Sequence, residues 1–402
     1  MILSNAILIN PIRTIEKNSS NPFIAMEDIE PNYRFVKSKT NRESRSGSKF
    51  KNGDTLFARI TPSLENGKTA YVDSLEDGKI GIGSTEFIVL SGKSGITENL
   101  FVYYLARTSE FRNAAIQSMT GTSGRQRVQE TVFDNFEMEI PDINNQLKIS
   151  NILGNLDNKI KNLRDINLIL EQIIQSIFKS WFIDFDGVTE FEDSELGKIP
   201  KGWQIGILEN FLDLTKGVSY KSQDLKFSNK ALVTLKSVKR GGGYTNIGLK
   251  SFDGKYNENQ VVKENDIIVA QTDLTQNADV IGKPALIRDS KHFDILVASL
   301  DIVIIKIKNN KILKFYIYYL FLTDRFQNHV YGYTSGTTVL HLAKDAIPNF
   351  VFILPPTKTL EKFDKLISTW IQKNHENNNQ IENLTKIRDF LLPKLMSGEI
   401  KV

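Results

Sequence analysis

Cysteine is missing from the 402 residues of this sequence, and histidine occurs only four times. Without cysteine there are no disulfide bonds, thiolate nucleophiles or cysteine-based zinc sites. The histidines (His292, His329, His341 and His375) are scattered without the spacing of metal ligands, so no metal site is expected among them. A reducing cytosol fits this composition.

Long apolar runs are also missing. The longest, residues 315–322, is much shorter than the roughly 20 residues that a membrane-spanning helix needs. The first residues, MILSNAILINPIRT, have no basic segment ahead of their apolar part, which does not fit a secretory signal peptide. We therefore expect a soluble protein of the cytoplasm.

Charge of one sign is not in large excess, because the formal net charge is only +4. This value permits nucleic-acid binding without requiring it. The segment KSKTNRESRSGSKFK, from Lys37 to Lys51, is more basic, with six Lys or Arg residues and one acid. Such a segment is either a solvated loop or an arm that meets phosphates, and the sequence leaves both interpretations open.

What the chain does contain is a duplication. Its motifs recur at a shift of 215 positions, as in Gly67-Lys68-x-Ala70 with Gly282-Lys283-x-Ala285 and Ser84-x-Glu86 with Ser299-x-Asp301. Asp54 matches Asp266 at a shift of 212, which implies a small insertion between them. A fixed shift over this length indicates that one structural unit is made twice.

Each copy is expected to be a compact α+β domain with the same order of elements. Short strands come first, then a helical stretch, then a Gly/Ser/Thr loop and a last strand that ends at proline. The expected strands are 55–60, 87–90 and 136–141 in the first copy and 267–270, 300–307 and 350–355 in the second. The expected helical stretches are 100–117 and 313–329.

A heptad pattern follows the first domain and predicts one long helix over residues 142–182. Its seam consists of Ile149, Leu153, Leu156, Ile160, Leu163, Asn167, Leu170, Ile174, Ile177 and Trp181. Asn167 either fixes the register of the seam or lies beside it in solvent. So long an apolar stripe needs a partner helix.

The expected partner is the segment 357–402. It has a similar spacing at Phe363, Ile367, Trp370, Ile381, Leu384, Leu391 and Leu395. The pattern that begins at Asn158 recurs at Asn379, 221 positions later, which indicates six additional residues in the second helix. Antiparallel packing would place the two domains at opposite ends of a rod with a pseudo-two-fold. Two heads so placed would reach two major-groove sites on one face of a duplex.

Three segments resemble the specificity subunits of Type I restriction–modification systems. They are LEQIIQSIFKSWFIDFDGV (170–188), LGKIPKGWQIGILEN (196–210) and NLTKIRDFLLPKLMSGEIKV (383–402). The resemblance implies an α+β fold, with two tandem target-recognition domains separated by two long helices in an antiparallel, pseudo-two-fold coiled coil. The domains would cover 1–141 and 203–356, the helices 142–182 and 357–402, and a connector 183–202.

The resemblance also implies a function and partners. Each domain would read one half of a bipartite, asymmetric target in double-stranded DNA, and the helices would set the gap between the halves. The helices would dock two methyltransferase subunits that modify adenine with S-adenosylmethionine, and restriction subunits that use ATP and Mg would complete the complex. The expected subunit interface is Lys179, Trp181, Phe182, Asp184, Phe185, Leu391, Leu392 and Leu395.

No chemistry of its own is expected from this chain, and no cofactor. Gly67-Lys68-Thr69 is not a phosphate-binding loop, because the required first glycine is Pro62 and the second copy has Pro284 in place of the hydroxyl. A turn between strands is the better interpretation. Asp184 and Asp186 are interpreted as solvated or docking residues rather than a metal-dependent nuclease centre.

DNA contacts are expected from polar loops at matching places in both copies, because Arg and Lys suit guanine, Asn and Gln suit adenine, and hydroxyls suit phosphates. The first set is the Gly121–Arg127 loop with Arg125, Gln126 and Arg127, matched by Thr337 and Thr338. The second is Arg59 and Lys68, matched by Gln271, Thr272, Gln276, Asn277 and Lys283. The third is Arg42, Arg45 and Lys49, matched by Lys236, Lys239 and Arg240.

Two other classes of function compete with DNA recognition. An enzyme with an unrecognised site would bind a cofactor or cut DNA alone, which the missing motifs argue against. A scaffold that pairs two partners through its helices would show no sequence-selective affinity for DNA.

Overall fold

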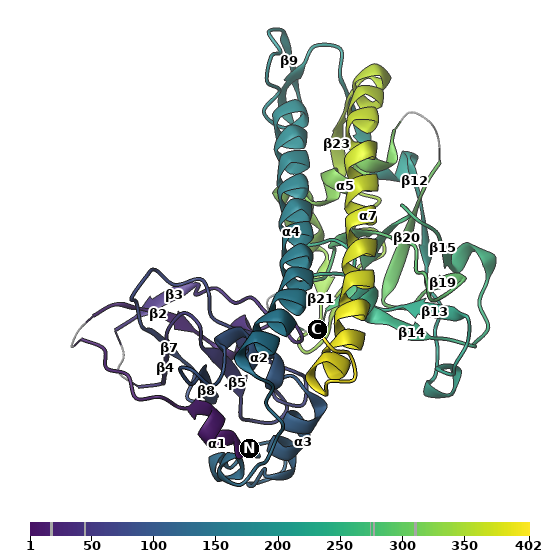
Figure 1. The fold of residues 1–402 in the computed structure, drawn as a ribbon. Coiled ribbons are helices and arrows are strands. Elements are labelled where there is room, and N and C mark those ends of the chain that lie inside the picture. Colours follow the sequence, from purple (N-terminus) through teal and green to yellow (C-terminus); the bar gives the residue numbers. More distant parts are fainter. Residues whose placement is uncertain (17–18, 44–45, 274, 276–277, 309–311) are drawn as a thin grey trace. The chain divides into compact units, whose positions relative to one another are not determined.

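The computed structural model describes residues 1–16, 19–43, 46–273, 275, 278–308 and 312–402. The chain divides into two units, the first formed by Met1–Ile166 with Asn377–Val402 and the second by Asn167–Glu376. Two helices of 40 residues, α4 (Ile143–Phe182) and α7 (Thr357–Met396), each contribute one part to each unit (Figure 1). Within the described part of the chain, no helix is both long and apolar enough to cross a membrane.

The first unit is built on two four-stranded sheets. One is antiparallel, in the order β1 (Ile7–Ile9), β8 (Phe87–Gly92), β5 (Thr55–Ala58), β6 (Thr69–Tyr71). The other has the order β3 (Thr40–Arg42), β2 (Asn21–Ile24), β7 (Gly81–Gly83), β4 (Ser48–Phe50), with β2 and β7 parallel. The remaining elements are α1 (Leu3–Ala6), α2 (Asn99–Leu105), α3 (Ser109–Gln117), η1 (Met26–Asp28) and η2 (Glu130–Asp134).

The second unit repeats these two sheets strand for strand. The antiparallel sheet has the order β12 (Leu212–Lys216), β20 (Ile302–Ile307), β16 (Ile267–Ala270), β18 (Pro284–Leu286). The mixed sheet has the order β14 (Leu249–Ser251), β13 (Lys230–Val233), β19 (Ile295–Ala298), β15 (Val261–Val262), with β13 and β19 parallel. The equivalent helices are α5 (Lys314–Phe321) and α6 (Asp324–Gly332).

Smaller elements complete the second unit. Its additional strands are β9 (Phe191–Ser194), β10 (Gly197–Pro200), β11 (Gln204–Ile207), β17 (Thr272–Asp273), β21 (Thr334–Ser335), β22 (Leu340–Leu342) and β23 (Val351–Leu354). Its 3-10 turns are η3 (Leu208–Asn210), η4 (Ser222–Asp224), η5 (Leu235–Ser237), η6 (Asn246–Gly248) and η7 (Glu258–Gln260). Identical strand order and strand polarity in both units show that the duplication seen in the sequence is a duplication of the fold.

The antiparallel sheet of each unit is covered on both faces, which explains its apolar strands. In β5, Leu56 belongs to the core shared with the mixed sheet, whereas Phe57 belongs to the core shared with the helices. In β16, Ile268 and Ile267 divide in the same way. Successive side chains of a strand point to opposite faces, so a strand buried on both faces is apolar throughout.

The helical stretch expected in each copy is two helices rather than one. The break falls at Thr108 and at Thr323, whose side chains accept hydrogen bonds from the backbone amides of Phe111 and Phe326. Both threonines have extended backbone angles. An N-cap residue adopts that conformation, and the chain therefore turns there before it starts the next helix.

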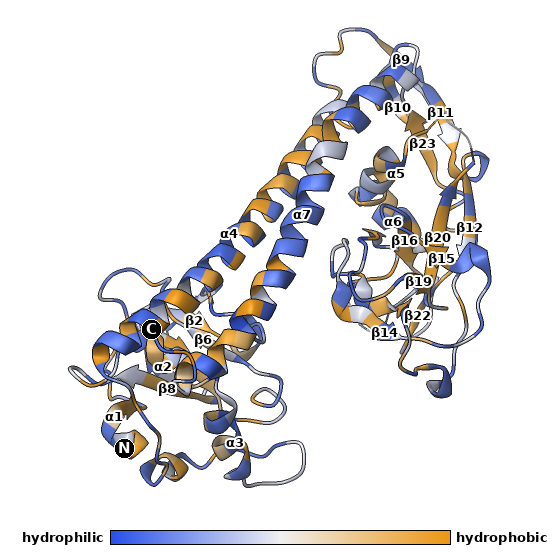
Figure 2. Ribbon diagram, turned by 45° about the vertical axis from the view of Figure 1, so that its right-hand side comes forward, coloured by the Kyte–Doolittle hydropathy of each residue, from blue (hydrophilic) through white to orange (hydrophobic). Residues whose placement is uncertain are grey.

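The two long helices run antiparallel where they meet. In the first unit, Ile149 and Leu153 of α4 share a core with Leu392 and Leu395 of α7. In the second unit, Phe178 of α4 packs on Phe363 of α7, with ring centroids 5.7 Å apart. Both helices show alternating apolar and polar residues along their length (Figure 2).

Two expectations about these helices are wrong. Both helices contain 40 residues, so the second has no six additional residues. Their buried positions instead match at a shift of 214, as for Leu153 with Ile367. The strict heptad also drifts, because Phe178 and Phe182 are buried while Ile177 and Trp181 are only half-buried. A straight helix has 3.6 residues per turn and does not follow a 3.5-residue seam over this length.

The last strand is present in one copy only. β23 lies within the expected strand 350–355 and pairs with β11, but residues 136–141 form no strand, and Glu137 makes only an isolated bridge, with Ile2. The segment that pairs with these residues is short, because Met1 hydrogen-bonds to Met138 and Leu3, which hydrogen-bonds to Phe136, already begins α1. The second helix also ends early, at Met396, and the residues after it leave the helix at Gly398 with φ +73°.

Candidate nucleic-acid interface

The loop Gly121–Arg127 is exposed along almost its whole length in the first unit. Backbone hydrogen bonds between Thr120 and Arg127 close it at its base, and the Thr61 amide donates to the Gln126 carbonyl at 3.0 Å. Gly121 has φ +126°, a backbone conformation that suits glycine. This closure holds Arg125 and Arg127 at the surface on a fixed base.

The second unit builds a matching loop from the β21–β22 hairpin. Gly336 has φ +114°, and a Cβ there would lie 2.1 Å from the Val339 carbonyl oxygen, so only glycine fits. Thr337 and Thr338 are exposed at the tip. The loops therefore occupy equivalent places, but one presents guanidinium groups and the other hydroxyls.

Two residues of the second expected set, Arg59 and Lys68, make hydrogen bonds within the first unit. Arg59 donates to Glu130 at 2.9 Å and to the Val128 carbonyl, and Lys68 donates to the Met26 carbonyl at 2.7 Å. Gly67 and Lys68 lie in the turn before β6, as Gly282 and Lys283 do before β18. The structure therefore places Lys68 as a brace of this turn.

In the second unit, Gln271 and Thr272 lie beside Asp301. The Gln271 amide donates to the Asp301 carbonyl at 2.8 Å, and the Thr272 hydroxyl donates to its carboxylate at 3.1 Å. Burial lowers the pKa of the Lys283 ammonium, while the nearby carboxylates of Asp324 and Asp279 act in the opposite direction. Lys283 is thus drawn partly into the protein.

Gln276 and Asn277 lie outside the described residues. Among the described residues nearby, the Asp273 carboxylate accepts hydrogen bonds from the amides of Thr275, Val280 and Ile281. Burial of Asp273 would raise its pKa, but these hydrogen bonds outweigh burial and lower it. The charged carboxylate therefore holds the amides of these three described residues.

The third expected set lies on the mixed sheets and the loops beside them. Arg42 stacks over the Phe23 ring at 3.5 Å, Lys49 lies in β4, and Arg45 is outside the described residues. In the second unit, Lys236 and Lys239 are exposed, and Arg240 lies 3.6 Å from Asp279. The expected match of this third set is wrong, because Arg42 and Lys49 lie in β3 and β4, whereas Lys236, Lys239 and Arg240 follow β13, the strand equivalent to β2.

Sequence reasoning missed the acidic partners of these cations. Glu86 holds Arg127 through three contacts of 2.6–3.0 Å, and Glu130 holds Arg59. The signal was present in the recurring Ser84-x-Glu86 and Ser299-x-Asp301 motifs, which we interpreted only as marks of duplication.

The subunit interface expected on the helices needs correction, because three of its residues are buried in the chain itself. Phe182, Leu392 and Leu395 are at most 6% exposed and belong to the two cores. The surrounding residues carry other contacts: Lys179 pairs with Asp184, Phe185 packs on Trp203, and Trp181 packs on Phe363, while Leu391 is half-buried. These three apolar residues are core positions, for which high hydrophobicity is the ordinary requirement.

A different apolar face of the helices is open to solvent. In the second unit, Ile173 and Leu366 are 40% and 36% exposed, and in the first unit Ile387 and Ile152 are 47% and 39% exposed. These two pairs are related by the same shift of 214 that relates the buried positions. Each unit therefore has one exposed apolar residue of α4 and one of α7 at equivalent positions, and we call these positions its apolar face.

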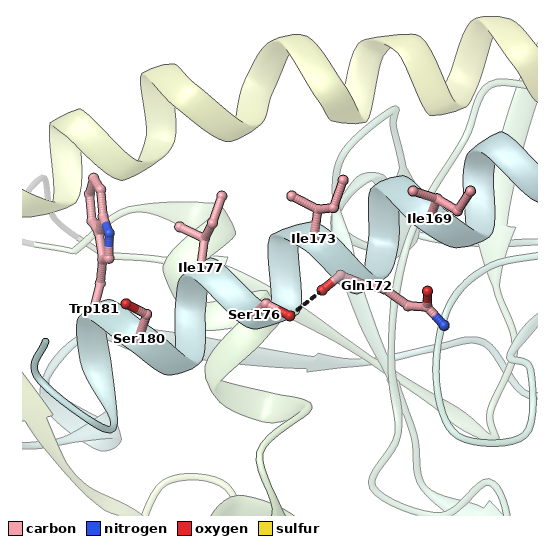
Figure 3. A pocket seen from close by; sticks show the side chains of 7 residues that line it. All are labelled: Ile169, Gln172, Ile173, Ser176, Ile177, Ser180 and Trp181. Carbon is pink, nitrogen blue, oxygen red and sulfur yellow. Dashed lines mark hydrogen bonds between the residues drawn. The ribbon is translucent and has the colours of Figure 1, made fainter.

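A groove of about 340 Å³ lies along this face in the second unit, lined by Ile169, Gln172, Ile173, Ser176, Ile177, Ser180 and Trp181. The apolar side chains of this lining point from α4 toward the side on which α7 runs (Figure 3). The long apolar wall and the shortage of charged groups suit a protein surface rather than a polar ligand.

Within the described ranges, no three His, Asp or Glu side chains gather in a way that suits a metal ion. Asp184 and Asp186 are instead engaged by Lys179 and Ser180.

Comparison with known proteins assigns the family. The model of the Type I restriction modification DNA specificity domain matches residues 9–172 and 200–388. Similar proteins include the MjaIX specificity subunit of Methanocaldococcus jannaschii, 29% identical over 77% of this chain and 71% of its own length. The HindI specificity subunit of Haemophilus influenzae is 23% identical over 87% of both chains.

The fold agrees with this result. The structure of a Type I restriction–modification S subunit from M. genitalium aligns over 98% of this chain and 95% of its own, with a TM-score of 0.57 and 15% identity. The chain belongs to the Type I restriction–modification DNA specificity family. It is the DNA sequence-specificity subunit, which is not itself catalytic and which works with DNA and the other subunits of such a system.

Proposed function

We propose that this chain reads a bipartite, asymmetric target in double-stranded DNA, with one half-site for each unit and a gap set by the two long helices. The observation that carries this proposal is the contrast between scaffold and surface. The two units share strand order and strand polarity, yet equivalent polar positions differ, as in the half-buried Arg59 with Gln271 and the exposed Arg127 with His341. A common scaffold with different polar groups suits two heads that read different bases.

The chemistry of these groups supports base and backbone contacts together. Arg and Gln side chains read guanine and adenine in the major groove, whereas hydroxyls and unpaired cations hold phosphates. The first unit offers guanidinium groups on the Gly121–Arg127 loop, and the second offers Gln271 with the hydroxyls of Thr337 and Thr338. The half-sites would therefore differ in base composition.

The helices would dock two methyltransferase subunits, one on each of the equivalent apolar faces. Ile173 with Leu366, and Ile387 with Ile152, support two sites of the same kind. An apolar face on a helix pair fits a partner that adds helices of its own. This interface replaces the buried positions Phe182, Leu392 and Leu395 as the docking surface.

The cofactors would belong to the partners, and the complex would act in the cytoplasm. S-adenosylmethionine would be bound by the methyltransferase subunits that modify adenine, and ATP with Mg by the restriction subunits that translocate and cut. The specificity chain would contribute recognition and assembly.

The test is to express the chain with the methyltransferase encoded beside it in a host without adenine methylation, and to map methyladenine over the genome. The expected result is one bipartite motif with a fixed gap, which disappears when the chain is omitted. Methylation that persists without the chain would contradict the proposal. A complex that assembles but methylates no site would favour a protein scaffold instead.

A further inference from the structure

Arg127 and Glu86 form an ion pair at the surface of the first unit. Arg127 closes the exposed loop, where it bridges both Ile60 and Thr120. Its side chain is 46% exposed and that of Glu86 is 23% exposed. A pair so open to water adds little to the stability of the fold, so stability gives a weak reason for its geometry.

The geometry of the pair leaves one edge of the guanidinium open. Nε donates to both Glu86 carboxylate oxygens at 3.0 Å, and Nη2 donates to Oε1 at 2.6 Å. Glu86 therefore occupies the side edge formed by Nε and Nη2. The end edge, formed by Nη1 and the second hydrogen of Nη2, carries two parallel donors, which is the arrangement that matches O6 and N7 of guanine.

The negative charge of Glu86 makes contact of Arg127 with a base more favourable than contact with a phosphate. A carboxylate beside the guanidinium repels a phosphate, but a guanine edge has no net charge and gains from an oriented donor pair. Arg125, two residues earlier, is exposed and makes no ion pair within the described part of the chain. Arg125 thus suits a phosphate, whereas Arg127 suits a base.

The second unit places other groups at the same points. The backbone amide of Arg59 donates to the Glu86 carbonyl, and that of Gln271 donates to the Asp301 carbonyl. The carbonyl of Arg59 then accepts from Val128, and that of Gln271 from Leu342, so Arg127 corresponds to the exposed His341. The acidic residue is kept in both units, but the arginine is not.

We propose that Arg127, oriented by Glu86, reads a guanine in the half-site of the first unit, and that the second unit reads a different base at the equivalent point. This assignment rests on the proposed function, because it assumes that the loop faces DNA. Arg127 is the specificity-determining residue, and Glu86 is a positioning residue that acts through it.

The experiment is selection from a randomised DNA duplex library by the full chain in complex with its methyltransferase. The wild-type complex should select a guanine at one position of one half-site. Arg127→Gln should lower the preference for that guanine by about 5- to 150-fold and leave the other half-site unchanged. Arg127→Lys should lose most of the same preference, because an ammonium keeps the charge but not the paired donors.

Two further variants separate orientation from charge. Glu86→Gln should weaken the same preference by about 2- to 10-fold, because the guanidinium is no longer held in place. The matched control Arg125→Gln should weaken binding to all sequences alike and reduce the salt dependence by about one phosphate contact. Melting temperatures of the variants check that each complex remains folded.

The outcomes distinguish this inference from the proposal on which it rests. A wild-type complex that selects no motif would overturn the proposed function and the base assignment together. A selected motif that Arg127→Gln leaves unchanged, or a loss of affinity equal to that of Arg125→Gln without any change in base preference, would overturn the assignment alone.

Discussion

Asp157 and Arg388 form an ion pair that is buried in the first unit, with both side chains 2% exposed and the two groups 2.8 Å apart. The Tyr104 hydroxyl donates to the other Asp157 oxygen at 2.7 Å. Burial and the neighbouring carboxylate of Asp157 raise the pKa of Tyr104 well above its ordinary value, so this hydroxyl remains a donor at neutral pH. Arg388 also pairs with the half-exposed Asp389. Loss of Asp157 therefore leaves the buried guanidinium with a carboxylate partner only at the surface, and loss of Arg388 leaves the buried Asp157 carboxylate without its cation.

The equivalent positions in the second unit, at the shift of 214, are Ile371 and Ile174, which are buried and apolar. We therefore expect Asp157→Asn to destabilise the protein by about 3–5 kcal/mol, whereas the double variant Asp157→Ile with Arg388→Ile should cost much less. Urea unfolding of the wild type and the two variants measures this difference. A double variant as unstable as the single one would show that apolar residues, which occupy these positions in the second unit, cannot replace the ion pair in the first.

At the scale of residues, the sequence indicated which side chains reach the surface better than it indicated their partners. The sequence predicts Arg125 and Arg127 as DNA contacts on a polar glycine loop, and both residues are exposed. The contact of Arg127 with Glu86 spans 41 positions and depends on the closure of the loop, which no local pattern records. Lys68 was misplaced for the same reason, because its partner is the carbonyl of Met26.

The helices α4 and α7 present the equivalent apolar faces on which two methyltransferase subunits are proposed to dock. Replacing Ile173 or Ile387 with arginine places a charge in one face and leaves the other intact. Each single variant should therefore bind one methyltransferase subunit, and the double variant should bind none, because an unpaired charge is costly in an apolar interface. Native mass spectrometry of the purified complexes gives the stoichiometry.

A control for this prediction is Ile12→Arg. Ile12 is 98% exposed and does not belong to either long helix. Its replacement adds the same charge without touching a docking face, so the complex should keep two methyltransferase subunits. Loss of one subunit with Ile12→Arg, or retention of both with Ile173→Arg and Ile387→Arg together, would exclude the helix faces as the docking sites.

At the scale of elements, periodicity predicted both long helices and the central strands of the two antiparallel sheets. It predicted the buried seam residues Ile149, Leu153, Ile160, Leu163 and Ile174, but not the buried residues at the end of α4. Ile177 fits the heptad as well as Ile174 does, but the drift of a straight helix brings Phe178 to the partner instead. The recurring asparagine pattern at Asn158 and Asn379 also suggested a false length difference, because the burial of the helices follows another register.

The duplicated fold has a functional consequence for the whole molecule. The two polar surfaces belong to separate units with separate cores, so a change in one should not reach the other. Gln271→Ala should alter base preference in one half of the target, by about 1–3 kcal/mol at a single position, and leave the other half and the gap unchanged. Methylation mapping of this variant beside the wild type is the measurement. Altered preference in both half-sites would contradict independent reading by the two units.

At this scale, the sequence predicted the duplication, the α+β class and the family resemblance. Recurring motifs can be recognised even where the exact ends of strands and helices cannot. The assignment of helix halves to units was not. It depends on contacts such as the one between Asp157 and Arg388, which lie 231 positions apart.

The separation of Asp157 and Arg388 in the sequence also affects folding during synthesis. A ribosome adding about 5–20 residues per second makes Arg388 roughly 10–50 s after Asp157. During this interval the first unit also lacks Leu392 and Leu395, which complete its core. The first unit begins synthesis first but completes its core last. A chain released before Leu392 therefore exposes part of that core, which a protease or chaperone can recognise.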